Sequence, residues 1–476
     1  MNQKLPCNFP DSRISGETPG KKEQIFGYFL GPCLVYMVYN GLAGTYLTQF
    51  YTDVLGLAGN LLTFMPLISK ILSSVTGLLI GRLIDRTRTP QGKARPWILI
   101  SGILLTVSGF LLYAVPRASR TAQIIWVVVS YNLFFSLAFS VYSLSHSLMV
   151  PLSTRDIRQR DALAMLTSTG TSMLPGMLTT ILMPLLVSKI GVGSGARGAW
   201  LTVMGLLSVV AIPATLLEYF FTLERVTAES DGNAQQQVPF LRQVSACFRD
   251  RYWVLVLVFT LLVQFAGSLS GSSMLYYCNW VLGNSVESGA KMQILVNMIG
   301  QAPLGFGVVA LWPLVRKFGK RRVTILGFAI AALGSGLVLL HSDDLLTVLG
   351  CLFLKSIGTL PTYVVASLLA EALDHVEWQQ GFRADGCSAS VSSIVQTLVL
   401  GLAQTLLLAG IQRFGYVSPE STAQVLNQPE SVQVFFRWCF AGIPMICYGI
   451  CAVLMIFYRL ESEMPRISQA LAGNRK

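Results

Sequence analysis

The sequence predicts an all-α membrane protein with twelve transmembrane helices, arranged in two pseudo-symmetric six-helix bundles with both termini in the cytoplasm. Three observations predict this fold class. Hydrophobic residues make up 53% and charged residues only 12% of the 476 residues, whereas soluble chains carry about 25% charged residues. Apolar runs of about 20 residues follow one another along the chain. Basic residues gather in the short loops between alternate runs, as they do in cytoplasmic loops.

Twelve apolar runs are expected to cross the bilayer. Each can span roughly 30 Å of hydrocarbon at about 1.5 Å per helical residue. We expect the spans at residues 25–50, 59–84, 96–116, 122–150, 162–188, 198–222, 252–282, 290–315, 323–341, 345–372, 387–412 and 432–458.

Two strongly basic loops lie at matching places in the two halves of the chain. Gly81–Trp97, between the second and third spans, holds five of the 35 Lys and Arg residues, namely Arg82, Arg86, Arg88, Lys93 and Arg95. Trp312–Arg322 occupies the same place after the eighth span. The repetition predicts an internal duplication, which in many transporters places the substrate site between the two halves near the membrane midplane.

The remaining loops set the orientation of the chain. The loop after the fourth span carries Arg155, Arg158 and Arg160, whereas residues 51–58 and 342–345 contain no Lys or Arg. Because basic loops are retained in the cytoplasm, both termini are predicted to be cytoplasmic.

These loops also predict the domain organisation. Residues 1–24 are polar and form a cytoplasmic tail rather than a signal peptide. The first bundle is expected at 25–222, a cytoplasmic linker at 223–250, the second bundle at 251–458 and a second cytoplasmic tail at 459–476.

Composition and motifs exclude several classes of function. The net charge of +12 lies mostly in short loops, so it indicates membrane orientation and not a nucleic-acid partner. Nine scattered cysteines without a CxxC pair and three histidines without metal-ligand spacing predict no metal site and no cofactor. No nucleophile–base–acid set and no phosphate-binding loop is found, so we do not expect an enzyme or coupling to ATP.

Two lysines lie inside predicted spans. Lys70 falls close to the middle of the second span and Lys355 inside the tenth. A lysine at that depth costs roughly 3 kcal/mol unless it faces a cavity or a partner. The acids near the spans all lie at span ends: Asp53, Glu218, Glu371 and Asp374. We therefore hypothesise that Lys70 faces a central cavity and binds an anionic or strongly polar group of a substrate; the alternative is packing of its stem, with a hydrogen bond to a backbone carbonyl.

Other polar residues within the spans form a candidate cavity lining. Ser73 lies one turn after Lys70, and Ser147 one turn after Ser143, so each pair shares a helix face. In membrane helices such residues also serve close helix packing, which is the alternative interpretation. The predicted substrate-binding residues are Lys70, Ser73, Tyr36, Asn40, Ser143, His146, Ser147, Ser168, Tyr363 and Thr397.

Three stretches resemble the glycoside–pentoside–hexuronide:cation symporter family of the major facilitator superfamily, which includes the melibiose carrier. They are FYTDVLGL at Phe50–Leu57, DRTRTPQGKARPW at Asp85–Trp97 and AEALDHVEWQQGFRADG at Ala370–Gly386. The resemblance extends over about residues 25–460. It implies the twelve-helix major facilitator fold and sugar uptake coupled to sodium or a proton.

The chain departs from this family at its chemical sites. The two aspartates that bind the coupling cation in the family's second helix correspond to Ser73 and Gly77 here. An acid of the family's first helix falls near Met37, and an acid of its fourth helix falls at Ser143. The helix 5 arginine falls at Ser168, whereas Lys70 matches a basic position that the family keeps.

The lysine of the family's eleventh helix falls near Thr397. Because sodium requires several oxygen ligands, we expect that this chain is not coupled to sodium by the family's mechanism. Lys70 would then hold the positive charge that a bound cation supplies in the family.

The loop charges predict a cytoplasmic gate. Basic residues after the second span can pair with acids after the tenth, and Asp85 can accept hydrogen bonds from a helix N-terminus. The predicted gating residues are Asp85, Arg86, Arg88, Arg95, Glu371, Asp374 and Glu377.

Together these features predict a monomeric, multi-pass transporter in the cell membrane that moves a glycoside or uronide by alternating access. A coupling proton or cation is left open as a partner beside the solute and the bilayer. Two other functions also remain open: a sodium-independent uniporter or exchanger of organic anions, and a membrane sensor or scaffold that does not transport.

Overall fold

A computed structural model describes most of the chain. The described residues are 10–16, 18–43, 45–57, 60–87, 89–154, 156–191, 194–225, 240–341, 344–382, 385–421 and 424–474. They divide into two compact units. Unit 1 comprises the described residues of Met1–Gly232 and Ser418–Gln424, and unit 2 those of Asn233–Val417 and Val425–Lys476.

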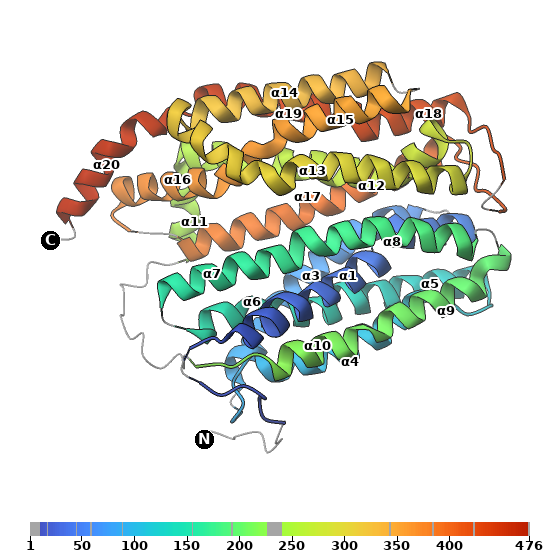
Figure 1. The fold of residues 1–476 in the computed structure, drawn as a ribbon, viewed down its shortest axis with the longest axis horizontal. Coiled ribbons are helices and arrows are strands. Elements are labelled where there is room, and N and C mark those ends of the chain that lie inside the picture. The colour runs from blue at the N-terminus through green and yellow to red at the C-terminus, as the bar shows by residue number, and fades with distance from the viewer. Residues whose placement is uncertain are drawn as a thin grey trace. The chain divides into compact units, whose positions relative to one another are not determined.

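Unit 1 is built of helices only, and the segments marked η are short π- or 3₁₀-helical turns (Figure 1). Its elements are η1 (Glu23–Leu30), α1 (Gly31–Ala43), α2 (Thr45–Gln49), η2 (Phe50–Val54), α3 (Asn60–Arg86), α4 (Arg95–Tyr113), α5 (Arg120–Asn132), η3 (Leu133–Ala138), α6 (Phe139–Ser153), α7 (Ile157–Ser168), η4 (Thr169–Met173), α8 (Leu174–Ile190), η5 (Ser194–Ala196), α9 (Arg197–Val209) and α10 (Ala211–Phe220).

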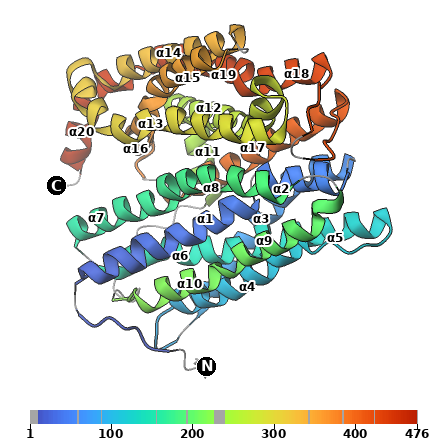
Figure 2. The same ribbon diagram turned by 45° about the vertical axis from the view of Figure 1, so that its right-hand side comes forward.

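Unit 2 is helical in the same way. Helices α14, α15 and α19 lie side by side in both views (Figures 1 and 2). Its elements are α11 (Phe240–Arg249), α12 (Arg251–Tyr277), η7 (Cys278–Leu282), α13 (Val286–Phe318), α14 (Lys320–Leu340), α15 (Leu345–Thr359), η8 (Leu360–Val364), α16 (Val365–Gln380), α17 (Asp385–Arg413), α18 (Glu430–Arg437), η9 (Trp438–Gly442), α19 (Ile443–Phe457) and α20 (Leu460–Asn474).

The structure confirms the all-α membrane fold class. Among the described residues, eleven helical stretches are long and apolar enough to cross a membrane. The remaining expected span, 290–315, lies within the 33-residue helix α13. Helices α11 and α20 lie in the predicted linker and C-terminal tail, so part of these segments is helical. The cytoplasmic location of the termini and the bundle boundaries stay predictions.

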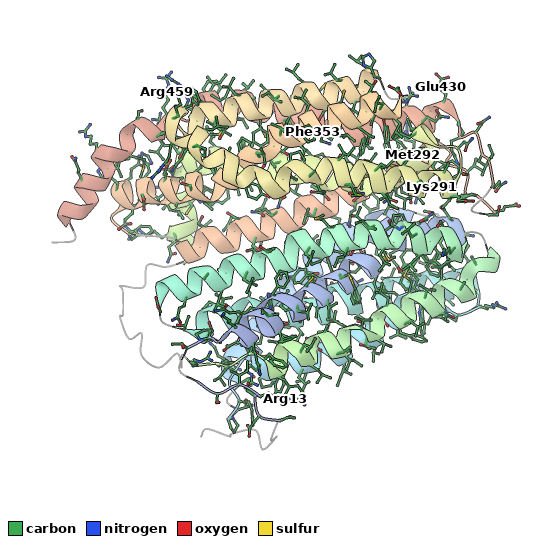
Figure 3. All side chains as sticks on the ribbon, viewed as in Figure 1. Arg13, Lys291, Met292, Phe353, Glu430 and Arg459 are labelled. Atoms are coloured by element: carbon green, nitrogen blue, oxygen red, sulfur yellow. The ribbon has the colours of Figure 1, made fainter. Side chains whose placement is uncertain are left out.

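Apolar side chains cover the outer surface of the helices (Figure 3). Leu346 and Leu340 are 79% and 77% exposed, and Phe353 is 46% exposed. Figure 3 shows Glu430 and Arg459 at opposite ends of the last long helical stretch. An apolar belt between charged ends is the surface that a bilayer covers.

Small residues allow the helices of unit 2 to pack closely. A Cβ atom built on Gly358 of α15 would lie 2.3 Å from the backbone nitrogen of Ala331 on α14. One built on Gly334 would lie 2.6 Å from the backbone nitrogen of Lys355. Backbone contacts of this kind are typical of membrane helices, which gain little from the hydrophobic effect and associate through packing.

A carboxylate caps the third long helix of unit 1. Glu224, which follows α10, accepts hydrogen bonds from the backbone N–H groups of Lys93, Ala94 and Arg95 at 2.8–2.9 Å. The guanidinium of Arg95 donates to the carbonyl of Tyr219 at 2.9 Å. Gly92 has a φ of +114°, and a Cβ there would lie 2.3 Å from the carboxylate carbon of Glu224. The glycine therefore gives the carboxylate access to the helix N-terminus.

Candidate functional site

Unit 2 contains an open pocket of about 400 Å³, with a largely apolar lining, around Lys355. Lys355 lies ten residues after the start of α15, about 15 Å along the helix at 1.5 Å per residue, which is close to the membrane midplane. Its Nζ donates a hydrogen bond to the Ser270 hydroxyl at 2.9 Å and lies 5.3 Å from the centre of the Phe440 ring. The hydrogen bond therefore joins Lys355 on α15 to Ser270 on α12.

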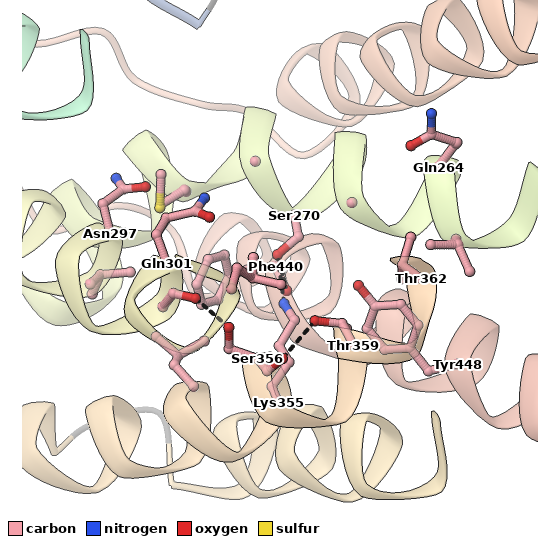
Figure 4. Close-up of a pocket in the computed structure, with 18 of the residues that line it drawn as sticks. Gln264, Ser270, Asn297, Gln301, Lys355, Ser356, Thr359, Thr362, Phe440 and Tyr448 are labelled. Carbon is pink, nitrogen blue, oxygen red and sulfur yellow. Dashed lines mark hydrogen bonds between the residues drawn. The ribbon is translucent and has the colours of Figure 1, made fainter. Parts of the chain in front are cut away.

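Amides and hydroxyls form the rest of the polar lining of this cavity. Figure 4 shows Asn297 and Gln301 of α13 on one side of Lys355, and Gln264 and Thr362 on the other. Among the described lining residues, Lys355 is the only Lys, Arg, Asp or Glu. The cavity can therefore offer several hydrogen bonds and one positive charge that no lining carboxylate neutralises.

Tyr363 is the predicted site residue that lines this cavity. It lies in η8, is 52% exposed, and its hydroxyl lies 3.4 Å from the carbonyl of Leu304. Thr397 does not line the cavity; it is on α17, and its hydroxyl donates to the Ser393 carbonyl at 2.8 Å.

In unit 1, Lys70 lies on α3 beside an aromatic ring. Its Nζ is 5.8 Å from the centre of the Phe135 ring. Within the described part of the chain, Lys70 Nζ has no hydrogen bond or ion pair with another side chain. The contact with Phe135 is of the cation–π kind, and it leaves the donors of the ammonium group available to a ligand.

Ser73 takes part in a contact between α3 and η3. Its hydroxyl donates to the Ser69 carbonyl at 2.8 Å and lies 3.1 Å from the Ser136 hydroxyl. Ser69 in turn donates to the Asn132 side chain at 2.8 Å. These bonds join two helices, so in this conformation Ser73 supports packing as well as lying one turn from Lys70.

An aromatic cluster surrounds Tyr36 on α1. Its ring packs edge-on against the rings of Phe139, Tyr142 and His146, with centroids 5.6, 6.1 and 6.3 Å away. Tyr36 and His146 are thus two predicted site residues that the structure brings together.

His146 belongs to a buried cluster that the sequence did not predict. Its Nδ1 lies 2.7 Å from Oε1 of Glu218 on α10, and the Tyr142 hydroxyl donates to Oε2 of the same carboxylate at 2.7 Å. Glu218 lies near the end of a span, as the sequence predicts. Its side chain is fully buried and bound on both oxygens, which the sequence does not indicate.

The other predicted substrate-binding residues lie apart from these contacts. Asn40 and Ser143 are half-buried, while Ser147 and Ser168 are exposed on α6 and α7. Ser147 donates to the carbonyl of Leu144 at 2.8 Å.

The structure gives several predicted gating residues partners inside their own units. Arg95 is 1% exposed and binds Tyr219, and Glu371 pairs with Lys320 and accepts from Tyr458 at 2.9 Å. Asp374 and Glu377 lie half-buried on α16, and Arg86 is exposed at the end of α3. The Asp85 side chain and the whole of Arg88 lie outside the described residues, and the gate stays a prediction.

Comparisons with known proteins agree with this architecture. Residues 27–462 match the family described as MFS/sugar transport protein. The chain is similar to the isoprimeverose transporter of Lactiplantibacillus pentosus, at 25% identity over 90% of this chain and 86% of that protein. It is also similar to the inner membrane symporter YicJ of Escherichia coli (strain K12), at 26% identity over 96% of both chains.

A D-xylose–proton symporter has a similar solved structure, with a TM-score of 0.59 at 14% identity over 93% of this chain and 98% of that one. The matches and the apolar helices make the protein a multi-pass transporter of the plasma membrane. Because the family match extends over residues 27–462, the chain belongs to the MFS/sugar transport protein family.

Proposed function

We propose that the protein moves a glycoside or a uronide-like sugar acid across the membrane by alternating access of its two bundles. The family match and the relatives support sugar transport, since one of them is named an isoprimeverose transporter. The duplicated basic loops support a two-bundle mechanism with a site near the midplane.

The cavity around Lys355 carries this proposal. Its amides and hydroxyls can bind the hydroxyl groups of a sugar, and Lys355 can bind a carboxylate. An ammonium group at this depth is costly without a counter-charge, so an anionic ligand would stabilise it. We assign Lys355 to the anionic or most polar part of the solute, and the corresponding role of Lys70 stays the hypothesis made from the sequence.

The positions of the family's cation ligands support a transporter without that sodium site. Ser73 and Gly77 carry no carboxylate, and the Ser73 hydroxyl already bonds to Ser69 and Ser136. A hard cation needs several oxygen ligands, carboxylates above all. Coupling to sodium at these positions is therefore not expected.

A second candidate is a sodium-independent uniporter or exchanger of organic anions. Lys70 and Lys355 favour it, because each lies inside a span and no described carboxylate pairs with either of them. In this case an acid group would be sufficient for binding and transport, and the solute would not need a sugar ring.

Thermal stabilisation of the purified protein separates these functions, because a ligand that binds the folded state raises its stability. The panel contains methyl β-D-glucoside, methyl β-D-xyloside, methyl β-D-glucuronide and simple organic acids, each with and without sodium. Stabilisation by the glucuronide without sodium supports the proposal, and stabilisation by organic acids lacking a sugar supports the second candidate. Sodium-enhanced stabilisation by a neutral glycoside, or unchanged glucuronide binding and transport by Lys70→Met, would contradict the role of the lysines.

A further inference from the structure

Unit 2 carries an apolar groove that is separate from the pocket around Lys355. The groove has a volume of about 250 Å³ and is formed by α13, α14, the end of α15 and η8. None of its described lining residues has a polar side chain, and none of them also lines the Lys355 pocket. The lining includes Leu311, Leu314, Phe318, Leu326, Ile330 and Pro361.

The close approach of Gly327 to Pro361 brings α14 and η8 together at this groove. A Cβ atom built on Gly327 would lie 2.5 Å from Cγ of Pro361. Pro361 belongs to η8, the short 3₁₀ turn between α15 and α16. By contrast, Leu314 of α13 and Leu326 of α14 line the same groove and are 47% and 63% exposed. The groove is therefore open on the apolar surface that a bilayer covers.

The groove begins at the end of unit 2 that carries the basic loop 312–322. Phe318 is the last residue of α13, and Val323 lies in the first turn of α14. At the other end of the groove, Ile330 lies ten residues after Lys320, the first residue of α14. Ten residues extend about 15 Å along a helix, half of a hydrocarbon core of about 30 Å. The groove thus has the depth of one membrane leaflet, the leaflet next to the basic loop.

Two exposed cations lie at this end of the groove, Lys317 and Arg322. The Nζ atom of Lys317 is 5.4 Å from the centre of the Phe318 ring, which lines the groove. Arg322 lies one helical turn before Leu326 and two turns before Ile330, so these three residues share a face of α14. Within the part of the chain that the structure describes, no ion pair joins either cation to a carboxylate.

Carboxylates already bind the neighbouring cation and the neighbouring helix N-terminus. Lys320 forms an ion pair with Glu371. Glu461 accepts from the backbone N–H groups of Lys320 and Arg321 at 2.8 and 3.0 Å, and so caps α14. An anion at the end of the groove must therefore be bound by side chains, and the two exposed cations are placed to do so.

We infer that the groove and its two cations bind one phospholipid with an anionic headgroup, whose acyl chain lies in the groove and whose phosphate is bound by Lys317 and Arg322. Every bilayer lipid has acyl chains, so the groove positions the lipid through packing contacts and does not select it. The cations select the headgroup, because anionic lipids attract basic side chains near the membrane surface. This site shares no residue with the solute pocket and does not depend on the proposed transport function.

The first experiment measures lipid binding to the full-length protein, purified in detergent, by native mass spectrometry. We expect a first dioleoyl phosphatidylglycerol to bind more tightly than dioleoyl phosphatidylcholine, which has the same acyl chains. Lys317→Gln/Arg322→Gln should weaken phosphatidylglycerol binding about 25-fold, about fivefold for each cation, and leave phosphatidylcholine binding unchanged. Equal binding of the two lipids by the wild type would overturn the inference.

A matched control removes the same charge elsewhere in unit 2. Lys291 is exposed in the first turns of α13, about 40 Å along that helix from Lys317. Arg413 is exposed at the end of α17. Lys291→Gln/Arg413→Gln should keep the preference for phosphatidylglycerol. A loss equal to that of the first double variant would show that binding follows net charge, and it would also overturn the site.

A second pair of variants tests the groove itself. Leu326→Trp fills the groove and keeps both cations, so it should weaken the binding of both lipids. Leu333→Trp changes a residue of the same helix that is similarly exposed, at 66% against 63%, but does not line the groove, and should bind lipid like the wild type. All these variants change exposed side chains and should keep the lipid-free unfolding midpoint. Unchanged phosphatidylglycerol binding by Leu326→Trp, or displacement of the lipid by an equal concentration of sn-glycerol 3-phosphate, would reduce the site to the cations alone and overturn the lipid site.

Discussion

Glu461 in unit 2 holds the same structural position as Glu224 in unit 1. Glu461, in the first turn of α20, accepts from the backbone N–H groups of Lys320 and Arg321 at 2.8 and 3.0 Å. Arg321 donates to the Met455 carbonyl at 3.3 Å, as Arg95 donates to Tyr219. A glycine with positive φ, Gly319 at +85°, again precedes the capped helix. We call the bonds of Glu224 to the start of α4 and of Glu461 to the start of α14 the two clasps; they are similar contacts in the two units, as expected for the internal duplication that the sequence predicts.

Breaking either clasp should destabilise its unit. Glu224→Gln and Glu461→Gln keep the side-chain shape but lose the charge that strengthens hydrogen bonds to the helix N-terminus. We expect each to cost about 1–3 kcal/mol, seen as a lower thermal unfolding midpoint. Glu463→Gln changes an exposed residue of α20 and should leave the midpoint unchanged. Equal midpoints for all three variants would show that the clasps add nothing.

The contact of α14 with α15 should not tolerate a methyl group at Gly358. An alanine there would meet the Ala331 backbone nitrogen at 2.3 Å, so the helices must separate. We expect Gly358→Ala to lose about 1–3 kcal/mol through overpacking. Gly350→Ala lies on the same helix with no atom within 4 Å of its Cβ, and should match or exceed the wild-type midpoint because alanine favours helix. Equal unfolding temperatures of Gly358→Ala and Gly350→Ala would contradict the predicted overpacking at Gly358.

Replacing the cavity lysine should remove anion binding without unfolding the protein. Lys355→Met keeps a long side chain and removes the cost of a buried charge, so the ligand-free midpoint should stay equal or rise. Stabilisation by methyl β-D-glucuronide should be lost, while any stabilisation by neutral glycosides persists. Lys291→Met, at an exposed residue of α13, is the control and should keep the response to the glucuronide. An unchanged response in Lys355→Met would place the anion elsewhere.

The cap of α15 should make a small pH-dependent contribution. The side chain and backbone N–H of Thr347 donate to Asp344 and hold its pKa below the ordinary value of 3.8. A carboxyl whose pKa is depressed in the folded state stabilises it above the unfolded pKa, and this contribution is lost as the pH falls through the folded pKa. Asp344→Ala should therefore unfold below the wild type at neutral pH, and the difference should shrink below about pH 4. A difference in unfolding midpoint between the wild type and Asp344→Ala that stays constant with pH would contradict this contribution of Asp344.

Hydropathy and loop charge were enough to predict the helical membrane fold. The expected span 198–222 corresponds to Arg197–Phe220, because a bilayer demands one long apolar run from each crossing segment. Helix ends were harder to predict. The helical stretch that contains the tenth expected span runs from Leu345 to Gln380, beyond residue 372, because the polar segment that follows the apolar run is itself helical.

The candidate site was only partly predictable. Lys355 could be recognised as unusual because charge inside a span is rare. Gln264, Asn297 and Gln301 were missed, since single amides in membrane helices commonly serve packing. The contact between His146 and Glu218 joins residues 72 positions apart, and neither position carries a spacing signal that would predict it.

The clasps also have a consequence for the order in which the chain can mature during synthesis. Glu224 bonds to groups 129–131 residues earlier in the chain, and Glu461 to groups 140–141 residues earlier. The third long helix of each half therefore leaves the ribosome before the carboxylate that caps it. Its first N–H groups lack this partner until the sixth span of that half has been synthesised. Each half can therefore complete this hydrogen-bonded cap only after its six spans and the glutamate that follows them have been synthesised.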